Sequence, residues 1–369
     1  MRFKTTARVV ALCISLSAAQ LDAASARAVR QWSEAILAPR GDAIPLAVLG
    51  DSDSHAYHDE LSFPPGGAKR GGVFRAGTFQ WTEVLALLRG SHVDLGPWGS
   101  WGSGRYLSAL KARLGFEGRS PRKQDFRNSF AISGAGCEAL TMGSARQVDS
   151  LRRLMDERPE AWRRGIVVIR IGVNTFGMDD SLDALASDPL APVAQATMKQ
   201  CLERIRETVR LIHERHPTTR VVLVGIFDNS HWPNYFAKWQ SAAALARISA
   251  GLDHFDRTLE RWAAGDPRLA FFDDRAWFAA RWGGRDGAGR PAYRSVRLAS
   301  GFEVRNLAGD SPAHSALADG HAGTAWNALW AQSLVALLDE RFGAGIPRIT
   351  DDEVARFVHT GGMPSEEGR

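Results

Sequence analysis

Residues 44–52 have the sequence IPLAVLGDS, and this stretch is the starting point for predicting the fold. Its first six residues are apolar, and the run ends at a glycine followed by an aspartate and a serine. A short apolar run that stops at a turn signal is typical of a strand buried on both faces of a sheet. We therefore predict a buried strand that places Gly50, Asp51 and Ser52 at its carboxyl end.

Further apolar runs follow along the chain, and longer amphipathic stretches separate them. The runs lie at residues 126–133, 166–171, 221–227 and 269–272, and the amphipathic stretches at residues 80–88, 145–155, 193–215, 242–262 and 323–341. Buried strands that alternate with helices indicate a mostly parallel sheet covered by helices on both faces. The sequence thus predicts the α/β class, as a three-layer α/β/α sandwich around a mostly parallel five-stranded sheet with loop insertions.

Segments rich in glycine and proline interrupt this alternation, which is typical of loops. PPGGAKRGG occupies residues 64–72, GPWGSWGSG occupies residues 96–104, and WGGRDGAGRP begins at residue 282. We interpret residues 27–348 as a single domain with insertions at about residues 60–104 and 282–312, and residues 349–369 as a C-terminal tail.

The first 26 residues have the features of a signal peptide. Arg2, Lys4 and Arg8 precede an apolar run at residues 9–19, and small residues around Ala26 fit a cleavage site. The apolar run is too short to span a bilayer, which takes about 20 residues. We expect export to the periplasm or the medium after cleavage, without stable insertion into the membrane.

The composition narrows the classes of partner. The chain has 46 Lys and Arg residues against 41 Asp and Glu residues, and 44% of its residues are hydrophobic. This profile excludes a disordered chain, and so small a positive excess argues against nucleic-acid binding. Loss of the leader leaves Cys137 and Cys201, whose number alone does not decide whether they form a disulfide. The sequence also leaves the oligomeric state open.

Polar residues follow the predicted strands at the points where the strands end. The first strand leads into Ser52, the second into Ser133 and Gly134, and the third into Asn174, while Asp319, Gly320 and His321 precede the last helix. The carboxyl ends of parallel strands meet at one edge of a sheet, and function gathers there. A serine, an imidazole, a carboxylate and hydrogen-bond donors at one edge are the groups needed for acyl transfer through a serine nucleophile.

Each of these residues has a role that follows from its chemistry. Serine is a weak nucleophile, so His321 is the candidate base that accepts the proton of Ser52, with Asp319 to orient the imidazole. A tetrahedral intermediate needs donors for its oxyanion, and the candidates are the backbone N–H groups of Ser52 and Gly134 and the amide of Asn174.

These segments, in this order and spacing, resemble the sequence blocks of the SGNH hydrolase (GDSL esterase/lipase) superfamily over about residues 44–341. By this resemblance Ser52 matches the nucleophile, Gly134 and Asn174 match the oxyanion-hole residues, and His321 matches the base. The resemblance implies a flavodoxin-like α/β/α fold that hydrolyses or transfers carboxylic esters without a cofactor.

Two positions depart from the pattern of that superfamily. Asp319 precedes His321 by two residues rather than three, and Thr175 stands where an aspartate is more usual. In an extended segment, residues two apart point to the same side, so Asp319 and His321 can still pair. The D-x-H pair also resembles that of SGNH-like polysaccharide acetyltransferases, in which the pair precedes the serine.

Several other residues compete for roles at this edge. His314 is the rival base, and His55, His58 and Asp59 form an H-x-x-H-D pattern in which a third and a fourth zinc ligand are not evident. We therefore predict no metal site and interpret these histidines as pocket wall or helix surface. The candidates for the substrate pocket are two residues after the fourth strand and two loop tryptophans, namely Asn229, His231, Trp98 and Trp101.

The function predicted from the sequence is an exported serine esterase that forms an acyl-enzyme, with O-acetyl groups on carbohydrate as the favoured substrate. The partner is then a small-molecule or glycan ester. One alternative is a polysaccharide O-acetyltransferase, suggested by the D-x-H spacing. The other is a non-catalytic glycan-binding protein on the same scaffold.

Overall fold

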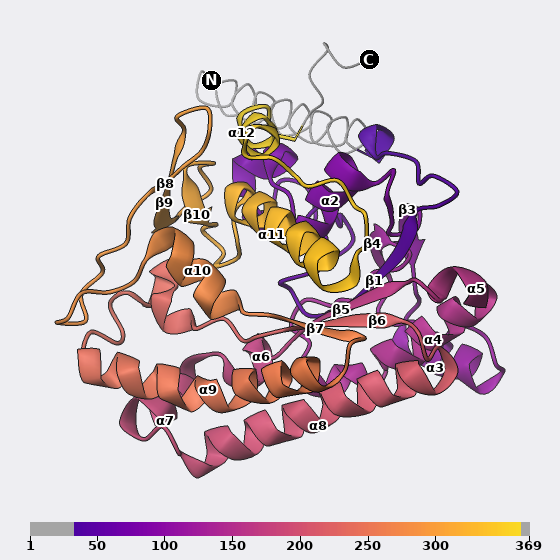
Figure 1. Ribbon diagram of the computed structural model, residues 1–369, viewed down its shortest axis with the longest axis horizontal. Helices are drawn as coiled ribbons and strands as arrows, with labels where there is room; N and C mark the ends of the chain where they lie inside the picture. Colours follow the sequence, from indigo (N-terminus) through magenta and orange to yellow (C-terminus); the bar gives the residue numbers. More distant parts are fainter. Residues whose placement is uncertain (1–32, 363–369) are drawn as a thin grey trace, which may run out of the picture.

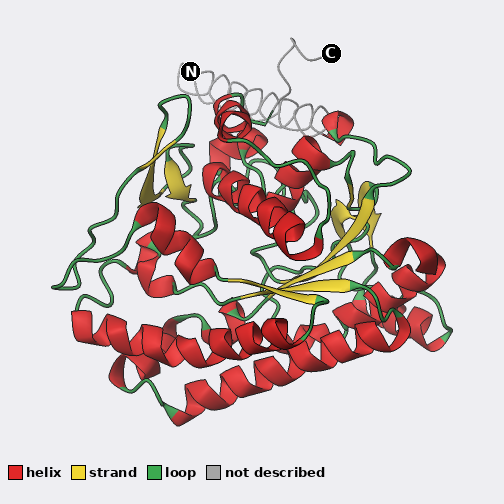
Figure 2. Cartoon of the chain, viewed as in Figure 1, coloured by secondary structure: helices red, strands yellow, loops and turns green. Residues whose placement is uncertain are grey.

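The computed structural model describes residues 33–362, and its centre is a parallel sheet of five strands in the order β2-β1-β5-β6-β7. Figure 1 shows this sheet between two groups of helices, and Figure 2 shows the same layers coloured by type of structure. The strands are β1 (Ile44–Gly50), β2 (Val93–Asp94), β5 (Ile166–Arg170), β6 (Arg220–Val224) and β7 (Leu269–Phe272). The predicted α/β class and three-layer architecture are confirmed.

The sheet is buried on both faces because its strands are apolar at every position. In β1, Leu46 and Val48 belong to one hydrophobic core, whereas Ala47 and Leu49 belong to the other. Successive side chains of a strand point to opposite faces, so one short apolar run contributes to both cores. The first core is packed against α2 (Trp81–Arg89), α10 (Asp274–Trp282), α11 (Thr324–Phe342) and α12 (Asp351–His359), and the second against α4 (Gln147–Glu157), α7 (Asp179–Ser187), α8 (Pro192–Arg215) and α9 (Ala242–Gly265).

The strand predicted at residues 126–133 is wrong, and β2 takes its place in the sheet. β2 pairs with the first two residues of β1, and residues 128–132 continue along the same edge of β1. Val48 N donates to Asn128 O at 3.0 Å and Phe130 N donates to Val48 O at 2.8 Å, but the only ladder pair is Val48 with Ser129. Two segments share one short edge, so neither has room for a full strand.

The predicted insertion at residues 60–104 also needs correction, because α2 and β2 belong to the helical layer and the sheet. Within it, β3 (Trp98–Trp101) lies outside the layers and pairs antiparallel with β4 (Lys123–Phe126), and the segment before α2 forms loops and the short helical turn Gly72–Gly77. The second insertion contributes β8 (Val296–Arg297) and β9 (Glu303–Ala308) to a small separate sheet, which β10 (His314–Ala316) completes just after it.

The predicted C-terminal tail is part of the packed structure as far as residue 362, because α12 lies against α2 and α11. The Phe357 ring lies 5.2 Å from the Phe79 ring, and Arg89 forms an ion pair with Glu353 at 2.7 Å. Val354 and Val358 also belong to the first core. The signal peptide predicted at residues 1–26 and the last seven residues, 363–369, lie outside the described residues.

Cys137 and Cys201 form a disulfide, which answers the question that their number left open. The bond joins a short helical turn, Cys137–Leu140, to α8 across 64 residues of sequence. It therefore fixes the loop that contains Gly134 to the longest helices of the second layer. Among residues 33–362, no helix is both long and apolar enough to cross a membrane.

The packing of α12 predicts a large loss of stability in the Phe357→Ala variant. Removal of a buried phenylalanine side chain costs about 3–5 kcal/mol, so the urea midpoint should fall clearly. The exposed Arg356 on the same helix provides the control, and Arg356→Ala should change the free energy of unfolding by less than about 0.5 kcal/mol. Equal stability of the two variants would mean that α12 does not pack on the domain.

Candidate active site

A cleft of about 270 Å³ opens where the strands of the central sheet end. It brings together Ser52 after β1, Asn174 after β5, Asn229 after β6, and the late pair Asp319 and His321. These five residues come from four separate parts of the sequence, as the rule for the carboxyl ends of parallel strands requires. The remaining walls include apolar and polar side chains, namely Val173, Met178, Phe227, Trp232, Asn234, Tyr235 and Trp326.

The turn that presents Ser52 depends on a glycine at the end of β1. A Cβ atom on Gly50 would lie 2.3 Å from the carbonyl oxygen of Arg170 on β5, so any other residue would force the two strands apart. The Gln147 side chain bonds to both the N–H and the C=O of Gly50, each at 2.8 Å. Gln80 Nε2 donates to the carbonyl of Ser52 at 3.3 Å. Ser52 is 7% exposed at the base of the cleft.

Asp319 and His321 pair within a tight turn rather than in the extended segment expected from the sequence. Gly320, between them, has a φ of 82° and its N–H donates to Leu317 O at 3.0 Å. The turn brings His321 Nδ1 to 3.1 Å from Asp319 Oδ1. Trp232 Nε1 donates to Gly320 O at 2.9 Å and ties the turn to the cleft wall.

Arg70 binds the same carboxylate and was not among the residues singled out in the sequence. Its Nη1 lies 2.6 Å from Asp319 Oδ2, and its backbone N–H donates to the same oxygen at 2.9 Å. A φ of 58° at Arg70 lets the backbone and the side chain reach one oxygen together. The guanidinium is held between rings, 4.3 Å from the centroid of Phe63 and 5.2 Å from that of Tyr57.

The surroundings of Asp319 keep its carboxyl group ionised. Burial alone would raise the pKa of Asp319, but the hydrogen bond and charge of His321 and the charge of Arg70 together lower it well below its usual range. Asp319 is therefore an anion that lies between the guanidinium of Arg70 and the imidazole of His321.

The two predicted oxyanion residues come from different segments: Gly134 lies in a loop, and Asn174 lies in the short helix α6 (Val173–Phe176). Asn174 Nδ2 donates to the carbonyl of Ala135 at 3.1 Å, next to Gly134 in the chain. Gly134 has a φ of 81° and no heavy atom within 4 Å of the position that a Cβ would take. Asn174 lines the cleft, and Gly134 lies one residue from its hydrogen-bond partner.

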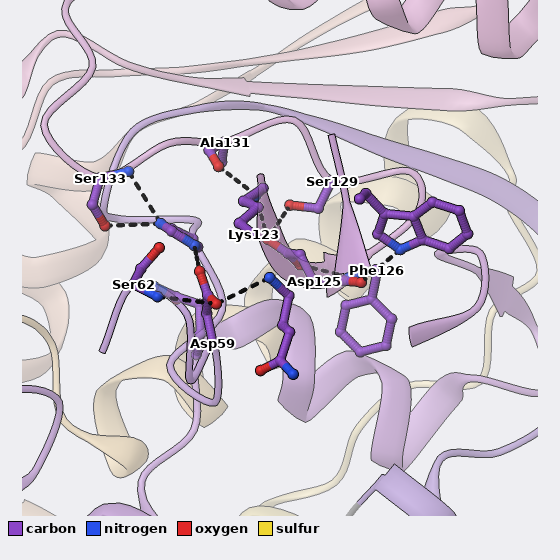
Figure 3. Close-up of polar contacts among 12 residues, drawn as sticks. Asp59, Ser62, Lys123, Asp125, Phe126, Ser129, Ala131 and Ser133 are labelled. Atoms are coloured by element: carbon purple, nitrogen blue, oxygen red, sulfur yellow. Dashed lines mark hydrogen bonds and ion pairs between the residues drawn. The ribbon is translucent and has the colours of Figure 1, made fainter. Parts of the chain in front are cut away.

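Beside the cleft lies a buried chain of hydrogen bonds that positions Ser133 (Figure 3). The backbone N of Ser133 lies 3.1 Å from His55 Nδ1, and its Oγ lies 2.9 Å from the same atom. On the other side of the ring, His55 Nε2 lies 2.9 Å from Asp59 Oδ2. Since the Ser133 N–H can only donate, Nδ1 accepts and Nε2 carries the proton that Asp59 binds. Burial, followed by the charge of Lys123, lowers the pKa of His55 and keeps the ring neutral.

A buried ion pair between Lys123 and Asp125 continues this network, also drawn in Figure 3. Lys123 donates to Asp125 and to the carbonyl of Ala131, and Ser129 Oγ donates to Asp125 Oδ2 at 3.0 Å. Burial lowers the pKa of Lys123 to about 8 despite its carboxylate partner. These contacts fix β4 and the irregular segment at residues 127–133 that leads to Gly134.

The H-x-x-H-D residues are thus buried partners in polar pairs rather than helix surface or pocket wall. His58 Nδ1 lies 3.0 Å from Glu83 Oε1, and His55 and Asp59 belong to the chain just described. Within residues 33–362, no group of three or more His, Cys, Asp or Glu side chains is arranged to hold a metal ion.

Four of the residues considered in the sequence lie outside the lining of the cleft. His231 Nδ1 lies 2.9 Å from the Tyr293 hydroxyl, and the imidazole of His314 lies against Gly309. The Trp98 ring packs edge-on against Phe126, and Trp101 Nε1 donates to the carbonyl of Asp125 at 3.0 Å. Of the candidates for the substrate pocket, only Asn229 lines the cleft, where its Nδ2 donates to Gly177 O at 2.7 Å.

Comparison with known proteins adds one family. No curated protein sequence matches the chain. One solved structure, named "putative platelet activating factor from Streptococcus pneumonia", is similar with 12% identity and a TM-score of 0.31, over 89% of this chain and 99% of that one. The sequence model of the GDSL-like Lipase/Acylhydrolase family matches residues 90–292, which include Gly134 and Asn174 and leave Ser52, Asp319 and His321 outside. Because the match covers more than half of the chain, the chain belongs to the GDSL-like Lipase/Acylhydrolase family, within the superfamily that its motifs resemble.

Proposed function

We propose that the protein is an exported serine esterase that hydrolyses carboxylic esters through an acyl-enzyme. The observation that supports this proposal most strongly is the common cleft of Ser52, Asn174, Asp319 and His321, in which His321 Nδ1 already meets the carboxylate. Membership of a lipase and acylhydrolase family supports a hydrolase.

The proposed reaction uses these groups in two steps. Ser52 Oγ attacks the ester carbonyl while its proton passes to His321 Nε2, which then gives it to the leaving alcohol as the C–O bond breaks. Water attacks the acyl-enzyme, His321 takes a proton from that water, and Ser52 recovers it as the acid leaves. Asp319, ionised throughout, holds the Nδ1 proton of the imidazole and stabilises the imidazolium.

The charge that forms on the carbonyl oxygen needs fixed donors. The Asn174 amide has two N–H bonds and uses one on Ala135 O, so the other is available for the oxyanion. The backbone N–H groups of Ser52 and Gly134 are the other proposed donors. The network around His55 supports this assignment because it holds Ser133, and hence Gly134, before substrate arrives.

An O-acetyl group on carbohydrate is the proposed substrate. The cleft of about 270 Å³ suits a small acyl group, and Trp232, Asn229 and Asn234 supply an aromatic surface and amides of the kind that bind sugars. Trp98 and Trp101, which the sequence predicts to line the substrate pocket, pack elsewhere, so this proposal rests on the cleft residues.

The D-x-H spacing keeps acyl transfer to a glycan as a second candidate. Both reactions share the acyl-enzyme and differ in whether water or a sugar hydroxyl accepts the acyl group. Product analysis with an acetylated donor and a glycan acceptor separates them. The esterase proposal predicts free acetate as the main product. Net acetylation of the glycan would instead show that the protein is an acyltransferase.

Arg70 has a further consequence for this chemistry, because its Nη1 lies 2.6 Å from His321 Nδ1. A guanidinium can only donate, so this contact fits the tautomer in which Nδ1 accepts and Nε2 carries the proton. Catalysis needs the opposite tautomer, in which Nδ1–H donates to Asp319 Oδ1 and Nε2 is free to accept. In that form Arg70 binds Oδ2 alone, and Asp319 is shared between the two side chains.

The first prediction concerns the nucleophile. Ser52→Ala should lower turnover of p-nitrophenyl acetate by roughly 10⁴- to 10⁶-fold, with the melting temperature almost unchanged, because the loss is of the reacting group. A fluorophosphonate should label Ser52 in the wild-type protein. Ser133→Ala is the matched control, because the Ser133 hydroxyl is also within hydrogen-bond distance of a histidine, His55. This variant should still be labelled at Ser52. Labelling of Ser133, or no labelling of folded protein, would contradict the assignment.

The second prediction concerns the oxyanion donor. Asn174→Ala should lower kcat by roughly 10²- to 10³-fold with little change in KM, because the bond to the oxyanion forms only in the transition state. Met178→Ala, on the wall of the same cleft, should change KM rather than kcat. An unchanged kcat in Asn174→Ala would remove this residue from the oxyanion hole.

The third prediction concerns Arg70. Arg70→Gln removes one of the charges that lower the pKa of Asp319, so this pKa should rise, and an NMR titration of the Asp319 carboxyl carbon measures the shift. Loss of the anchor should also lower kcat by roughly 10- to 100-fold. Arg70→Lys keeps the charge and should restore the low pKa of Asp319. A faster Arg70→Gln enzyme would instead mean that Arg70 inhibits the site by competing for Nδ1.

A further inference from the structure

The helix α3 (Arg105–Arg113) exposes its large apolar side chains to solvent, and its one buried residue is a serine. Ser108 is 2% exposed, and its hydroxyl donates to the carbonyl of Gly118. The large apolar residues of the helix and of the turn after it are exposed instead, namely Tyr106 (80%), Leu107 (51%), Leu110 (53%), Leu114 (64%) and Phe116 (64%). A surface helix of a globular protein normally has the reverse arrangement.

The spacing of these residues makes one continuous apolar stripe. At about 100° per residue, Tyr106, Leu107, Leu110 and Leu114 fall within an arc of about 100°. Lys111 lies beyond one side of this arc, and Arg113 lies beyond the other. An apolar stripe between basic residues is the pattern of a helix that lies in the plane of a membrane surface.

A second feature beside α3 is cationic. A groove of about 330 Å³ lies between α3 and α4, where Arg113, Arg146 and Arg153 face one carboxylate, Asp149. Arg146 is paired with Asp149 at 2.8 Å, and Arg153 donates to backbone carbonyls of Ala112 and Phe116. For Arg113, the described residues provide no carboxylate partner. The groove therefore keeps an excess of positive charge next to the apolar stripe.

We propose that α3 and residues 114–116 form a docking surface for membranes that contain anionic phospholipid. The stripe would enter the boundary between headgroups and acyl chains, and Lys111, Arg113 and the groove would bind lipid phosphates. This surface shares no residue with the cleft, so the inference does not depend on the proposed esterase activity.

The charges favour a membrane over a second copy of the chain. A symmetric dimer through this surface would bring Lys111 and Arg113 of both copies into one interface, because a twofold interface joins identical patches. Like charges at a desolvated interface repel, whereas anionic lipid phosphates neutralise them. A short amphipathic helix also gives reversible surface binding, which requires no membrane-spanning helix.

The test is co-sedimentation of the full protein with vesicles of phosphatidylcholine alone or mixed equally with phosphatidylglycerol. Binding should appear with the mixed vesicles and fall at least tenfold when salt rises from about 0.1 M to about 1 M, because the Debye length shrinks from about 10 Å to about 3 Å. Leu107→Ser with Leu110→Ser, and separately Lys111→Glu with Arg113→Glu, should each weaken binding roughly tenfold or more.

A control uses apolar residues elsewhere that are even more exposed than Leu107 and Leu110. Leu190 and Val193 are 74% and 78% exposed near the start of α8, so Leu190→Ser with Val193→Ser should bind the mixed vesicles like the wild type. All three double variants should keep their circular dichroism spectrum. No binding to mixed vesicles, equal binding to both vesicle types, or equal loss in the control variant would overturn the proposal. A concentration-dependent dimer that the Leu107 and Leu110 substitutions dissociate would overturn it in favour of a second copy.

Discussion

The close approach of β1 and β5 at Gly50 sets the position of Ser52 at the candidate active site. Both strands are buried on both faces, so neither can shift without exposing one of two hydrophobic cores. At the end of β1 the chain passes so near the Arg170 carbonyl that no side chain fits. The turn that follows therefore begins at a fixed place, and it leads Ser52 to the cleft.

The second constraint is the carboxylate of Asp319, which binds a cation and an imidazole at the same time. Arg70 Nη1 lies 2.6 Å from Oδ2 and His321 Nδ1 lies 3.1 Å from Oδ1, so each oxygen has its own side-chain neighbour. A carboxylate fixed on both sides holds the imidazole in one orientation, which a lone aspartate two residues away in a turn would do less well. In the proposed mechanism, this contact with Arg70 lets a pair with two-residue spacing take the place of the more usual three-residue spacing.

The regular parts of this arrangement could be predicted from the sequence, because they follow from local patterns. Apolar runs that end in Gly-Asp-Ser or Gly-Val-Asn are visible in one sequence, and the topology of a parallel sheet then brings their ends together. Arg70 could not be found in this way, because a glycine-rich loop has no periodicity and its contact with Asp319 spans 249 residues. The same reason explains why the strand expected at residues 126–133 is wrong. The sequence pattern identifies an apolar run, but it does not show which segments compete for one edge of β1. The burial of α12 likewise depends on contacts with Phe79 and Arg89 that lie far away in sequence.

The buried polar network next to Gly134 is costly for stability, which indicates that it serves to position that segment. Lys123, Asp125, His55 and Asp59 are nearly inaccessible to water, and a well-packed apolar core of the same volume is often at least as stable as such pairs. The segment that they hold has only a few backbone hydrogen bonds to β1, so apolar contacts alone, which lack direction, would allow it several positions. Hydrogen bonds with fixed geometry select one of them. Donors for an oxyanion are useful only if they already point to the place where the charge will form. In the proposed mechanism Gly134 is such a donor, and the directional buried network next to it fixes its segment before any substrate binds.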